Sequence, residues 1–166
     1  HGTIEQNLAM AFARGKTRGL RTGVTRAKRE MFRTELKSLE LDLENRLRTD
    51  VGLLSGGQRQ ALSLLMATFS QPKILLLDEH TAALDPARAA LVTRLTDEAV
   101  ARHGLTTLMV THNMHQALAM GNRLIMMHEG RIIYELAGED KKKATTEDLL
   151  HEFEKLKAVS DRTLLA

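Results

Sequence analysis

Hydrophobic residues recur at helical spacing through residues 3–69 of the chain. At the start, Thr3 and Gln6 have the spacing of a capping box, and the apolar residues that follow share one helical face. Thr25 and Ser55 are further helix-capping residues, and Pro72 ends the last of these helices. Helices are therefore predicted over residues 3–13, 25–39, 43–47 and from Ser55 to Pro72.

The pattern changes to continuous apolar runs after Pro72. Residues 74–77 are four aliphatic residues without alternation, which predicts a strand buried on both faces of a parallel sheet. Asp85 and Pro86 begin a helix that Gly104 ends, and residues 106–111 form a second buried strand. Strand, helix and strand in this order predict a right-handed βαβ crossover.

The last third of the chain alternates short elements. A short helix is expected over residues 114–120, and a hairpin pairs residues 123–127 with 131–135 across Glu129-Gly130. An amphipathic helix is expected over residues 146–156. The methionines of this region are interpreted as core-filling residues: Met109, Met114, Met120, Met126 and Met127.

The amino-acid composition excludes some classes of protein but does not indicate a function. The 166 residues suffice for one domain with a real core, and a net charge of +3 does not imply a nucleic-acid partner. The absence of cysteine excludes disulfides and thiolate metal sites. No apolar run has the length needed to span a bilayer, so a membrane role requires a partner.

A basic run between Arg14 and Arg29 contains seven cations and no acid. A solvated surface loop is the favoured interpretation, and a face toward acidic lipid or a partner is the alternative. Nucleic-acid binding is disfavoured because no aromatic stacking residue is interleaved with the cations.

The start of the helix after Leu54 has features of an anion site. Ser55 and Gln58 form a capping box, and Gly56 and Gly57 lack a Cβ, which lets another molecule approach the backbone. Free N–H groups at the positive end of a helix attract anions. An ordinary capped helix is the alternative interpretation of this stretch taken alone.

Polar residues follow both predicted strands at the edge where parallel sheets bind ligands. Asp78 and Glu79 end the first strand, and Thr111 and His112 follow the second. One carboxylate could hold Mg²⁺ through water while its neighbour activates an attacking water, and His112 could donate to a terminal phosphate. A solvated corner and a structural histidine are the alternatives. His112 and His115 could share a metal, but the sequence offers no third ligand nearby.

Together these motifs resemble the ATPase subunit of ABC transporters. Leu54-Ser55-Gly56-Gly57-Gln58 is similar to the family's signature sequence, and residues 74–79 resemble its Walker B strand with the catalytic glutamate. Ala83-Leu84-Asp85 resembles the D-loop, and Val110-Thr111-His112 the switch histidine. The resemblance covers roughly residues 3–135 in the family's order.

The resemblance implies a fold and its division. The fold class is α/β, with an incomplete P-loop-NTPase-like parallel sheet and a helical subdomain. Residues 1–71 would be the helical subdomain ending in the signature helix. Residues 72–166 would be the remaining part of the α/β ATPase core plus a C-terminal helix.

The resemblance also implies ATP and Mg²⁺ as cofactors and a role for each residue. Asp78 would act on Mg²⁺ through water, Glu79 as general base, and His112 on the γ-phosphate. The signature would contact ATP held by a second ATPase subunit in a head-to-tail dimer, and Asp85 would help to hold that interface. The signature residues concerned are Ser55, Gly56, Gly57 and Gln58.

Partners and location follow from the same resemblance. A transmembrane permease would dock on the helical subdomain, and a substrate-binding protein would act indirectly, with no nucleic acid involved. The ATPase would be cytoplasmic, peripheral on the inner face of the cell membrane. Several residues depart from the common family pattern and resemble a bacterial subgroup of substrate-binding-protein-dependent importers for aromatic amino acids or related solutes: Ala61, His80 and Asn113.

The sequence contains no G-x-x-x-x-G-K-[S/T] motif that could cradle phosphates. Gly15-Lys16-Thr17 is similar to its end, but Met10 occupies the position of the first glycine. We therefore expect the C-terminal portion of a nucleotide-binding domain that does not bind or hydrolyse ATP alone, and that exposes sheet edge and apolar surface.

Two other functions are compatible with parts of this pattern. A non-catalytic relic or regulatory half-domain would offer its signature in trans. The ABC ATPases of chromosome maintenance and DNA repair carry a similar signature, but long coiled coils precede it there, and no sustained heptads precede Ser55.

Overall fold

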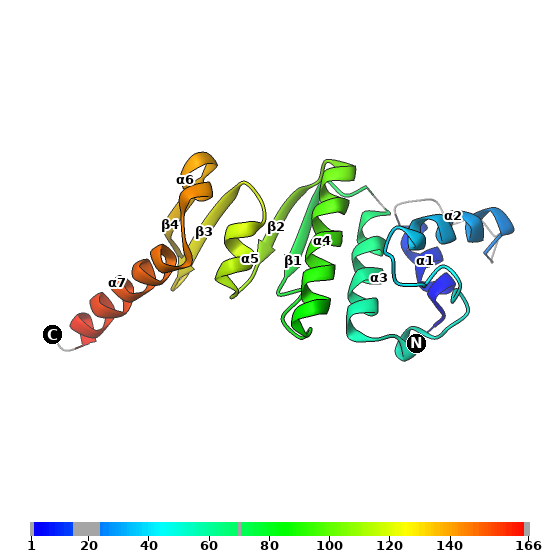
Figure 1. Cartoon of the computed structure of the whole chain (residues 1–166), viewed down its shortest axis with the longest axis horizontal. Helices are drawn as coiled ribbons and strands as arrows, with labels where there is room; N and C mark the ends of the chain where they lie inside the picture. The colour runs from blue at the N-terminus through cyan, green and yellow to red at the C-terminus, as the bar shows by residue number, and fades with distance from the viewer. Residues whose placement is uncertain (1, 15–23, 70, 165–166) are drawn as a thin grey trace. The chain divides into compact units, whose positions relative to one another are not determined.

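The computed structural model describes residues 2–14, 24–69 and 71–164 (Figure 1). The chain divides into two compact units, His1–Met109 and Val110–Ala166. Helices alternate with a parallel pair of strands in the first unit, and an antiparallel pair lies in the second. The predicted α/β class is confirmed.

The helices of the first unit begin where the sequence places their caps. Thr3 and Ser55 both form complete capping boxes, and Thr25 accepts a hydrogen bond from the Lys28 amide. A 3₁₀ turn, η1 (Val51–Leu53), precedes Ser55. The helices of this part are α1 (Ile4–Phe12), α2 (Arg26–Lys37) and α3 (Gly56–Thr68).

The predicted helix at residues 43–47 is wrong. This segment is a series of turns, and Glu40 and Asp42 before it have a left-handed backbone, each with φ 55°. Leu43 and Leu47 are nevertheless buried, as members of the core. Their spacing of four residues imitates a helical face, although two consecutive turns place both side chains inward.

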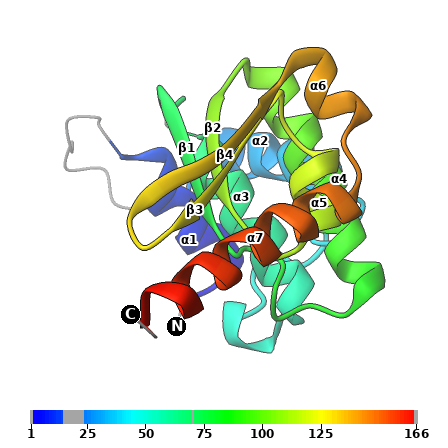
Figure 2. The same ribbon diagram turned by 90° about the vertical axis from the view of Figure 1, so that its left-hand side faces the viewer.

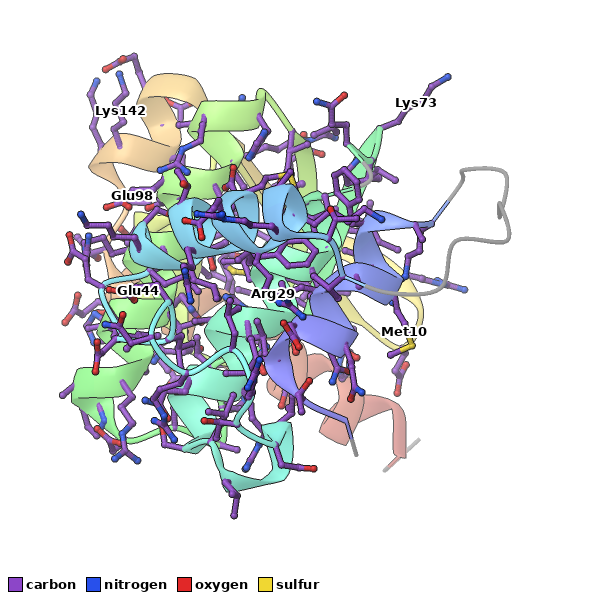
Figure 3. The ribbon with its side chains drawn as sticks, turned by 90° about the vertical axis from the view of Figure 1, so that its right-hand side faces the viewer. Met10, Arg29, Glu44, Lys73, Glu98 and Lys142 are labelled. Atoms are coloured by element: carbon purple, nitrogen blue, oxygen red, sulfur yellow. The ribbon has the colours of Figure 1, made fainter. Side chains whose placement is uncertain are left out.

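The core of the first unit lies among its helices. Phe12, Phe32 and Phe69 form an aromatic cluster with ring centroids 6.0–6.3 Å apart. The chain start is tied to this core because the Ile4 amide donates to the Thr49 carbonyl at 3.0 Å. Arg29 of α2, labelled in Figure 3, forms a 2.7 Å ion pair with Glu5 of α1. Most of the basic run, including residues 15–23, lies outside the described residues.

Strands β1 (Ile74–Asp78) and β2 (Thr106–Val110) pair with each other and are joined by helix α4 (Pro86–His103). Asp85 caps α4 and Gly104 ends it in the left-handed conformation, as predicted. Helices α3 and α4 pack side by side (Figure 1).

Burial of these strands on both faces was a wrong expectation. Leu75 is buried against the helical core, whereas Ile74 is 51% exposed and Leu76 66% exposed; on β2, Leu108 is 49% exposed. The helices pack on one face, and no described element of this unit covers the other. The expected exposure of apolar sheet surface is therefore confirmed.

The second unit is built on a hairpin, seen with its helices in Figure 2. Strand β3 (Arg123–His128) pairs antiparallel with β4 (Arg131–Ala137), and the register shifts at Met126/Met127. Glu129 and Gly130 have φ values of 48° and 75°, as the predicted tight turn requires. The helices are α5 (Met114–Ala119), α6 (Gly138–Lys143) and α7 (Thr146–Leu164); the sequence did not indicate α6, and α7 extends beyond the predicted end.

The methionines of the hairpin region only partly fill the core. Met120 and Met126 are buried, Met109 and Met114 are half-buried, and Met127 is 57% exposed. The core-filling interpretation is therefore wrong for Met127, because the register shift after Met126 turns it outward.

Candidate functional site

The helix start at Ser55 has the geometry that its sequence predicts. The Ser55 hydroxyl accepts a hydrogen bond from the Gln58 amide at 3.3 Å, and the Gln58 side chain accepts from the Ser55 amide at 3.0 Å. Arg59 donates to the Leu54 carbonyl at 2.6 Å. The amides of Gly56 and Gly57 are the first two helical N–H groups, which have no partner within the helix. This end of α3 therefore carries donors suited to an anion.

Gly57 contacts the start of α4 and Gly56 contacts the turn before it, which the sequence did not reveal. A Cβ at Gly57 would lie 3.3 Å from the Cβ of Arg88, and a Cβ at Gly56 would lie 3.2 Å from the end of Leu84. Gly57 is buried at this contact. The absence of a side chain at Gly57 therefore lets α3 approach the start of α4.

Asp85 belongs to the same cluster. Its carboxylate accepts a hydrogen bond from the Arg88 amide at 3.1 Å and pairs with the Arg88 guanidinium at 3.3 Å. Asp85 caps α4, while Arg88 contacts Gly57 of α3. The structure thus brings the predicted residues Ser55–Gln58 and Asp85 together through Arg88, a residue that no motif singled out.

Asp78 and Glu79 lie at the carboxyl end of β1, as predicted. Both are exposed, and Glu79 has a left-handed backbone with φ 44°. The Glu79 carbonyl accepts a hydrogen bond from the Ala82 amide at 3.0 Å, which begins the turn leading to Asp85. Two carboxylates therefore project from this edge of the sheet without being buried.

His80 follows these acids and turns toward α4. Its Nε2 lies 3.2 Å from the hydroxyl of Thr96, which is fully buried, and that hydroxyl lies 2.8 Å from the Val92 carbonyl. Partial burial lowers the pKa of the His80 imidazole below its ordinary value. Burial therefore favours the neutral form of the ring.

His112 lies in the second unit, in the segment between β2 and α5. A network holds this segment: the Thr111 hydroxyl donates to the Gln116 side chain at 2.9 Å, and the Asn113 amide donates to Thr111 at 3.1 Å. Asn113 in turn caps α5 by accepting from the Gln116 amide at 3.1 Å. His112 itself is exposed between these two anchored neighbours.

The described residues supply only part of what Mg²⁺ or a nucleotide needs. No group of three His, Cys, Asp or Glu side chains in this part of the chain could hold a metal ion. Asp78 offers one exposed carboxylate, so Mg²⁺ at this position would need phosphate and water ligands in addition. This donor set fits a nucleotide-bound Mg²⁺, which usually keeps several waters.

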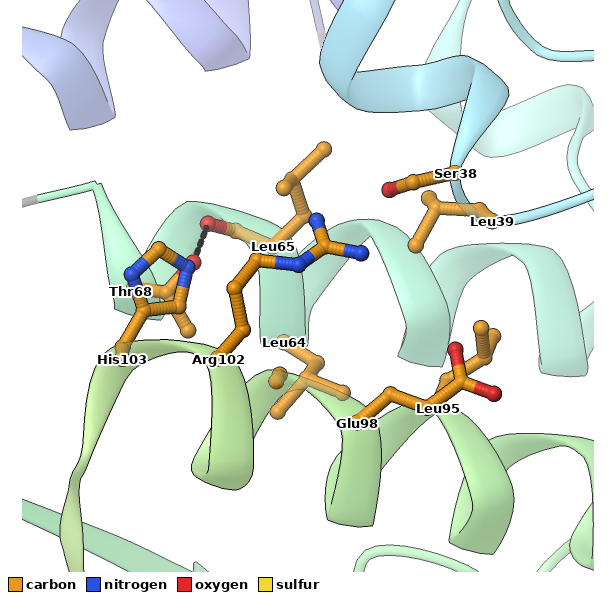
Figure 4. A pocket seen from close by; sticks show the side chains of 10 residues that line it. Ser38, Leu39, Leu64, Leu65, Thr68, Leu95, Glu98, Arg102 and His103 are labelled. Carbon is orange, nitrogen blue, oxygen red and sulfur yellow. Dashed lines mark hydrogen bonds between the residues drawn. The ribbon is translucent and has the colours of Figure 1, made fainter.

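A small pocket lies elsewhere in the first unit, between α3 and α4 (Figure 4). Its volume is about 20 Å³, enough for roughly one water molecule. Leu64 and Leu65 line it together with Arg102 and His103. None of the predicted site residues lines this pocket. None of the described helices is long and apolar enough to cross a membrane.

Comparison with known proteins gives the same family throughout. The ABC transporter family model matches residues 1–82. A tyrosine transport ATP-binding protein of Clostridioides difficile is 45% identical over 92% of this chain, which spans 60% of that relative. A methionine import ATP-binding protein of Streptococcus mutans is 34% identical over 91% of this chain, which spans 40% of it.

Solved structures agree in fold. Two structures of an ATP-binding cassette of an ABC transporter, one in its ADP conformation, superpose with TM-scores of 0.70 and 0.69 at 25% and 26% identity. Each comparison covers 92% of this chain and 63% or 62% of the solved chain. The chain thus spans about three fifths of these proteins.

Proposed function

Because this chain belongs to the ABC transporter ATP-binding family, we propose that it is part of the ATP-hydrolysing component of an ABC importer. Proteins of this family bind ATP and are ATPases, and the importer subunits pair with transmembrane permeases. The observation that carries the proposal is the pair of exposed carboxylates, Asp78 and Glu79, at the carboxyl end of a parallel strand. Ligands of open parallel sheets bind at this edge.

We propose that the two carboxylates have different roles. Asp78 would hold a nucleotide-bound Mg²⁺ through water; the ion, when bound, neutralises charge on the phosphates. Glu79 would orient the attacking water and accept its proton. His112 would donate a hydrogen bond to the γ-phosphate.

The start of α3 would serve the ATP of a second subunit in a head-to-tail dimer. The amides of Gly56 and Gly57 and the Ser55 hydroxyl are suited to a phosphate, and Gln58 holds Ser55 in place through the capping box. Asp85 would help to hold the dimer interface. Its cap on α4 and the contact of Arg88 with Gly57 support this proposal, because they link the start of α3 to Asp85.

The test uses the full-length ATPase that contains this chain, with and without the substitution Glu79→Gln. We expect the variant to retain Mg²⁺-ATP binding and to lose at least about a hundredfold in kcat, the usual scale for a general base. Ser63→Ala, an exposed position on α3 away from its first turn, is the control and should keep wild-type kcat. Wild-type hydrolysis by Glu79→Gln would contradict the proposed role.

For the transported solute we propose an aromatic amino acid. The relative with 45% identity is named for tyrosine transport, and His80 and Asn113 fit the importer subgroup that the sequence resembles. Uptake of labelled tyrosine by the assembled transporter should be inhibited by excess tyrosine or phenylalanine and not by methionine. Equal inhibition by methionine would contradict this assignment.

For assembly we propose that residues 1–71 form a helical subdomain that meets the permease at the inner face of the membrane, and that a substrate-binding protein acts through the permease. Residues 72–166 would form the remaining ATPase core and C-terminal helix. Charge reversal at Arg18 and Arg21, which lie outside the described residues, tests the docking face. If the double variant assembles normally with the permease, the basic run is only a solvated loop.

A further inference from the structure

The contact between His80 and Thr96 fixes which ring nitrogen carries a proton. The Thr96 hydroxyl has one hydrogen, and the Val92 carbonyl at 2.8 Å can only accept. The hydroxyl therefore donates to Val92 and must accept from His80, whose Nε2 lies 3.2 Å away. The ring is held as the Nε2–H tautomer, bonded to a group with no exposure to solvent.

This contact lies next to a backbone conformation that needs support. Glu79 has φ 44°, a left-handed value that residues other than glycine adopt at a cost. Such a conformation persists only where packing and hydrogen bonds from the surrounding structure hold it in place. Strand β1 fixes the chain before Glu79, and the bond from Ala82 to the Glu79 carbonyl holds the turn after it. The His80 ring adds an anchor on α4 directly beyond Glu79.

We propose that His80 is a positioning residue for Glu79, acting through its hydrogen bond to the buried Thr96 hydroxyl. Because the His80 ring is bonded to α4, the peptide between Glu79 and His80 keeps one orientation. This orientation in turn fixes the direction of the Glu79 Cα–Cβ bond. The inference rests on the proposed role of Glu79 as general base. The sequence pattern alone does not predict the contact between His80 and Thr96, because the two residues are sixteen positions apart.

A packing role alone would not require this pair of side chains. Thr96 is fully buried, so a valine of the same shape would fill its place without a hydroxyl to solvate. The hydroxyl is instead shared between a carbonyl of its own helix and the ring beside Glu79.

The test measures ATP hydrolysis by the full-length protein carrying Thr96→Val or Thr96→Ser. Thr96→Val removes the acceptor, and we expect kcat to fall about tenfold while the KM for ATP changes less than twofold, since a misplaced base slows the chemical step. Thr96→Ser keeps the hydroxyl and should restore most of kcat. Thr34→Val is the matched control, because Thr34 makes the same bond to a carbonyl four residues earlier but has no histidine partner.

A second variant keeps the test decisive if Thr96→Val lowers stability. His80→Leu removes the donor at a half-buried position, and it should lower kcat as much as Thr96→Val does. The double variant should lose no more than either single variant, since both remove one interaction. If the losses of kcat in the two single variants multiply in the double variant, the positioning role is overturned. A Thr96→Ser variant whose kcat is as low as that of Thr96→Val would overturn it as well.

The outcomes separate this inference from the function it rests on. If the wild type hydrolyses ATP and Glu79→Gln does not, but both Thr96→Val and His80→Leu keep wild-type kcat, only the positioning role is refuted. If Glu79→Gln hydrolyses ATP at the wild-type rate, the proposed function fails and the inference fails with it.

Discussion

At the scale of single residues, the two signature glycines have different surroundings. A methyl group at Gly57 would meet the Cβ of Arg88 at 3.3 Å, and that atom is fixed to the backbone of α4. A methyl group at Gly56 would meet only the terminal methyl of Leu84, which can rotate away. Gly57 therefore has a structural role in this chain in addition to any contact with phosphate.

We predict that Gly57→Ala lowers the free energy of unfolding by about 1–2 kcal/mol, because α3 and α4 must separate slightly to admit the methyl group. Gly56→Ala should change it by less than about 0.5 kcal/mol, since alanine's better helix propensity offsets a small adjustment of Leu84. Urea unfolding of the chain at low concentration measures both. Equal effects of the two substitutions would show that Arg88 does not limit the approach of α3.

The sequence predicts those residues of the site whose partners are near in the chain. Ser55 and Gln58 are three positions apart, as are Asp85 and the Arg88 amide, so the capping pattern reveals both bonds. The contacts of Gly57 with Arg88 and of His80 with Thr96 join separate elements. They depend on how α4 packs, which no local pattern encodes.

At the scale of elements, Asp85 combines a helix cap with a charge. Its carboxylate accepts the Arg88 amide and pairs with the Arg88 side chain. The two contributions can be separated, because asparagine caps helices as well as aspartate but carries no charge.

We predict that Asp85→Ala destabilises the chain by about 1 kcal/mol, the usual cost of losing a cap. Asp85→Asn should cost no more than about 0.5 kcal/mol, because an ion pair between two half-exposed side chains contributes little. Chemical denaturation of both variants measures the difference. An asparagine variant as unstable as the alanine variant would mean that the charge, not the cap, stabilises the start of α4.

A buried lysine fastens α5 in the second unit. The Lys141 ammonium donates to the carbonyls of Leu118 and Met120 at the end of α5, and burial lowers the pKa of Lys141. These two carbonyls belong to the group of acceptors that a helix end leaves without internal partners. The neighbouring Lys142 is exposed and pairs with Glu139.

We predict that Lys141→Met lowers the stability of the second unit by about 1–3 kcal/mol, because it leaves the carbonyls at the end of α5 without their donor. Lys142→Met is the matched control and should have an effect near zero. Hydrogen exchange of the amides of α5 and β3 reports on this unit directly. Unchanged protection in Lys141→Met would contradict the role of the lysine as a cap.

The sequence predicts the boundaries of helices better than the burial of side chains on the strands. The boundaries of α4 followed from Asp85, Pro86 and Gly104, each of which acts locally. The run of aliphatic residues in β1 predicted burial on both faces, but burial depends on which elements cover the sheet, and Leu76 is exposed. The turns at residues 43–47 were misread because buried leucines four apart also fit a helix.

At the scale of the molecule, the first unit presents an apolar sheet face. Ile74, Leu76 and Leu108 are about half to two thirds exposed on paired strands. We predict that the isolated chain self-associates through this face, because contiguous exposed apolar surface favours association. Sedimentation velocity over a hundredfold range of concentration should show a rising mean mass.

The substitution Leu76→Lys should reduce this association, since a charge on the face must be desolvated on contact. Leu53→Lys is the control, because Leu53 is 75% exposed in η1, away from the strands. A chain that stays monomeric at every concentration, or an equal effect of both substitutions, would contradict the prediction.

Nucleotide binding requires groups that this chain of 166 residues lacks. The chain has no glycine-rich phosphate loop, and the described residues contain no three-ligand metal cluster. Asp78 and Glu79 add negative charge to this edge of the sheet, and negative charge repels the phosphates of ATP. The curated relatives extend well beyond the matched stretch, which spans 60% of the tyrosine transport protein.

We therefore predict that the isolated chain of 166 residues binds Mg²⁺-ATP with a dissociation constant no tighter than about 1 mM, a free energy of binding near −4 kcal/mol. The full-length ATPase should bind at least about a hundredfold more tightly in the same calorimetric titration. In that protein, Asp78→Asn should weaken the dependence of binding on Mg²⁺, since the carboxylate would hold the ion through water. Micromolar, Mg²⁺-dependent binding by the isolated chain would mean that its own residues already form a complete phosphate site.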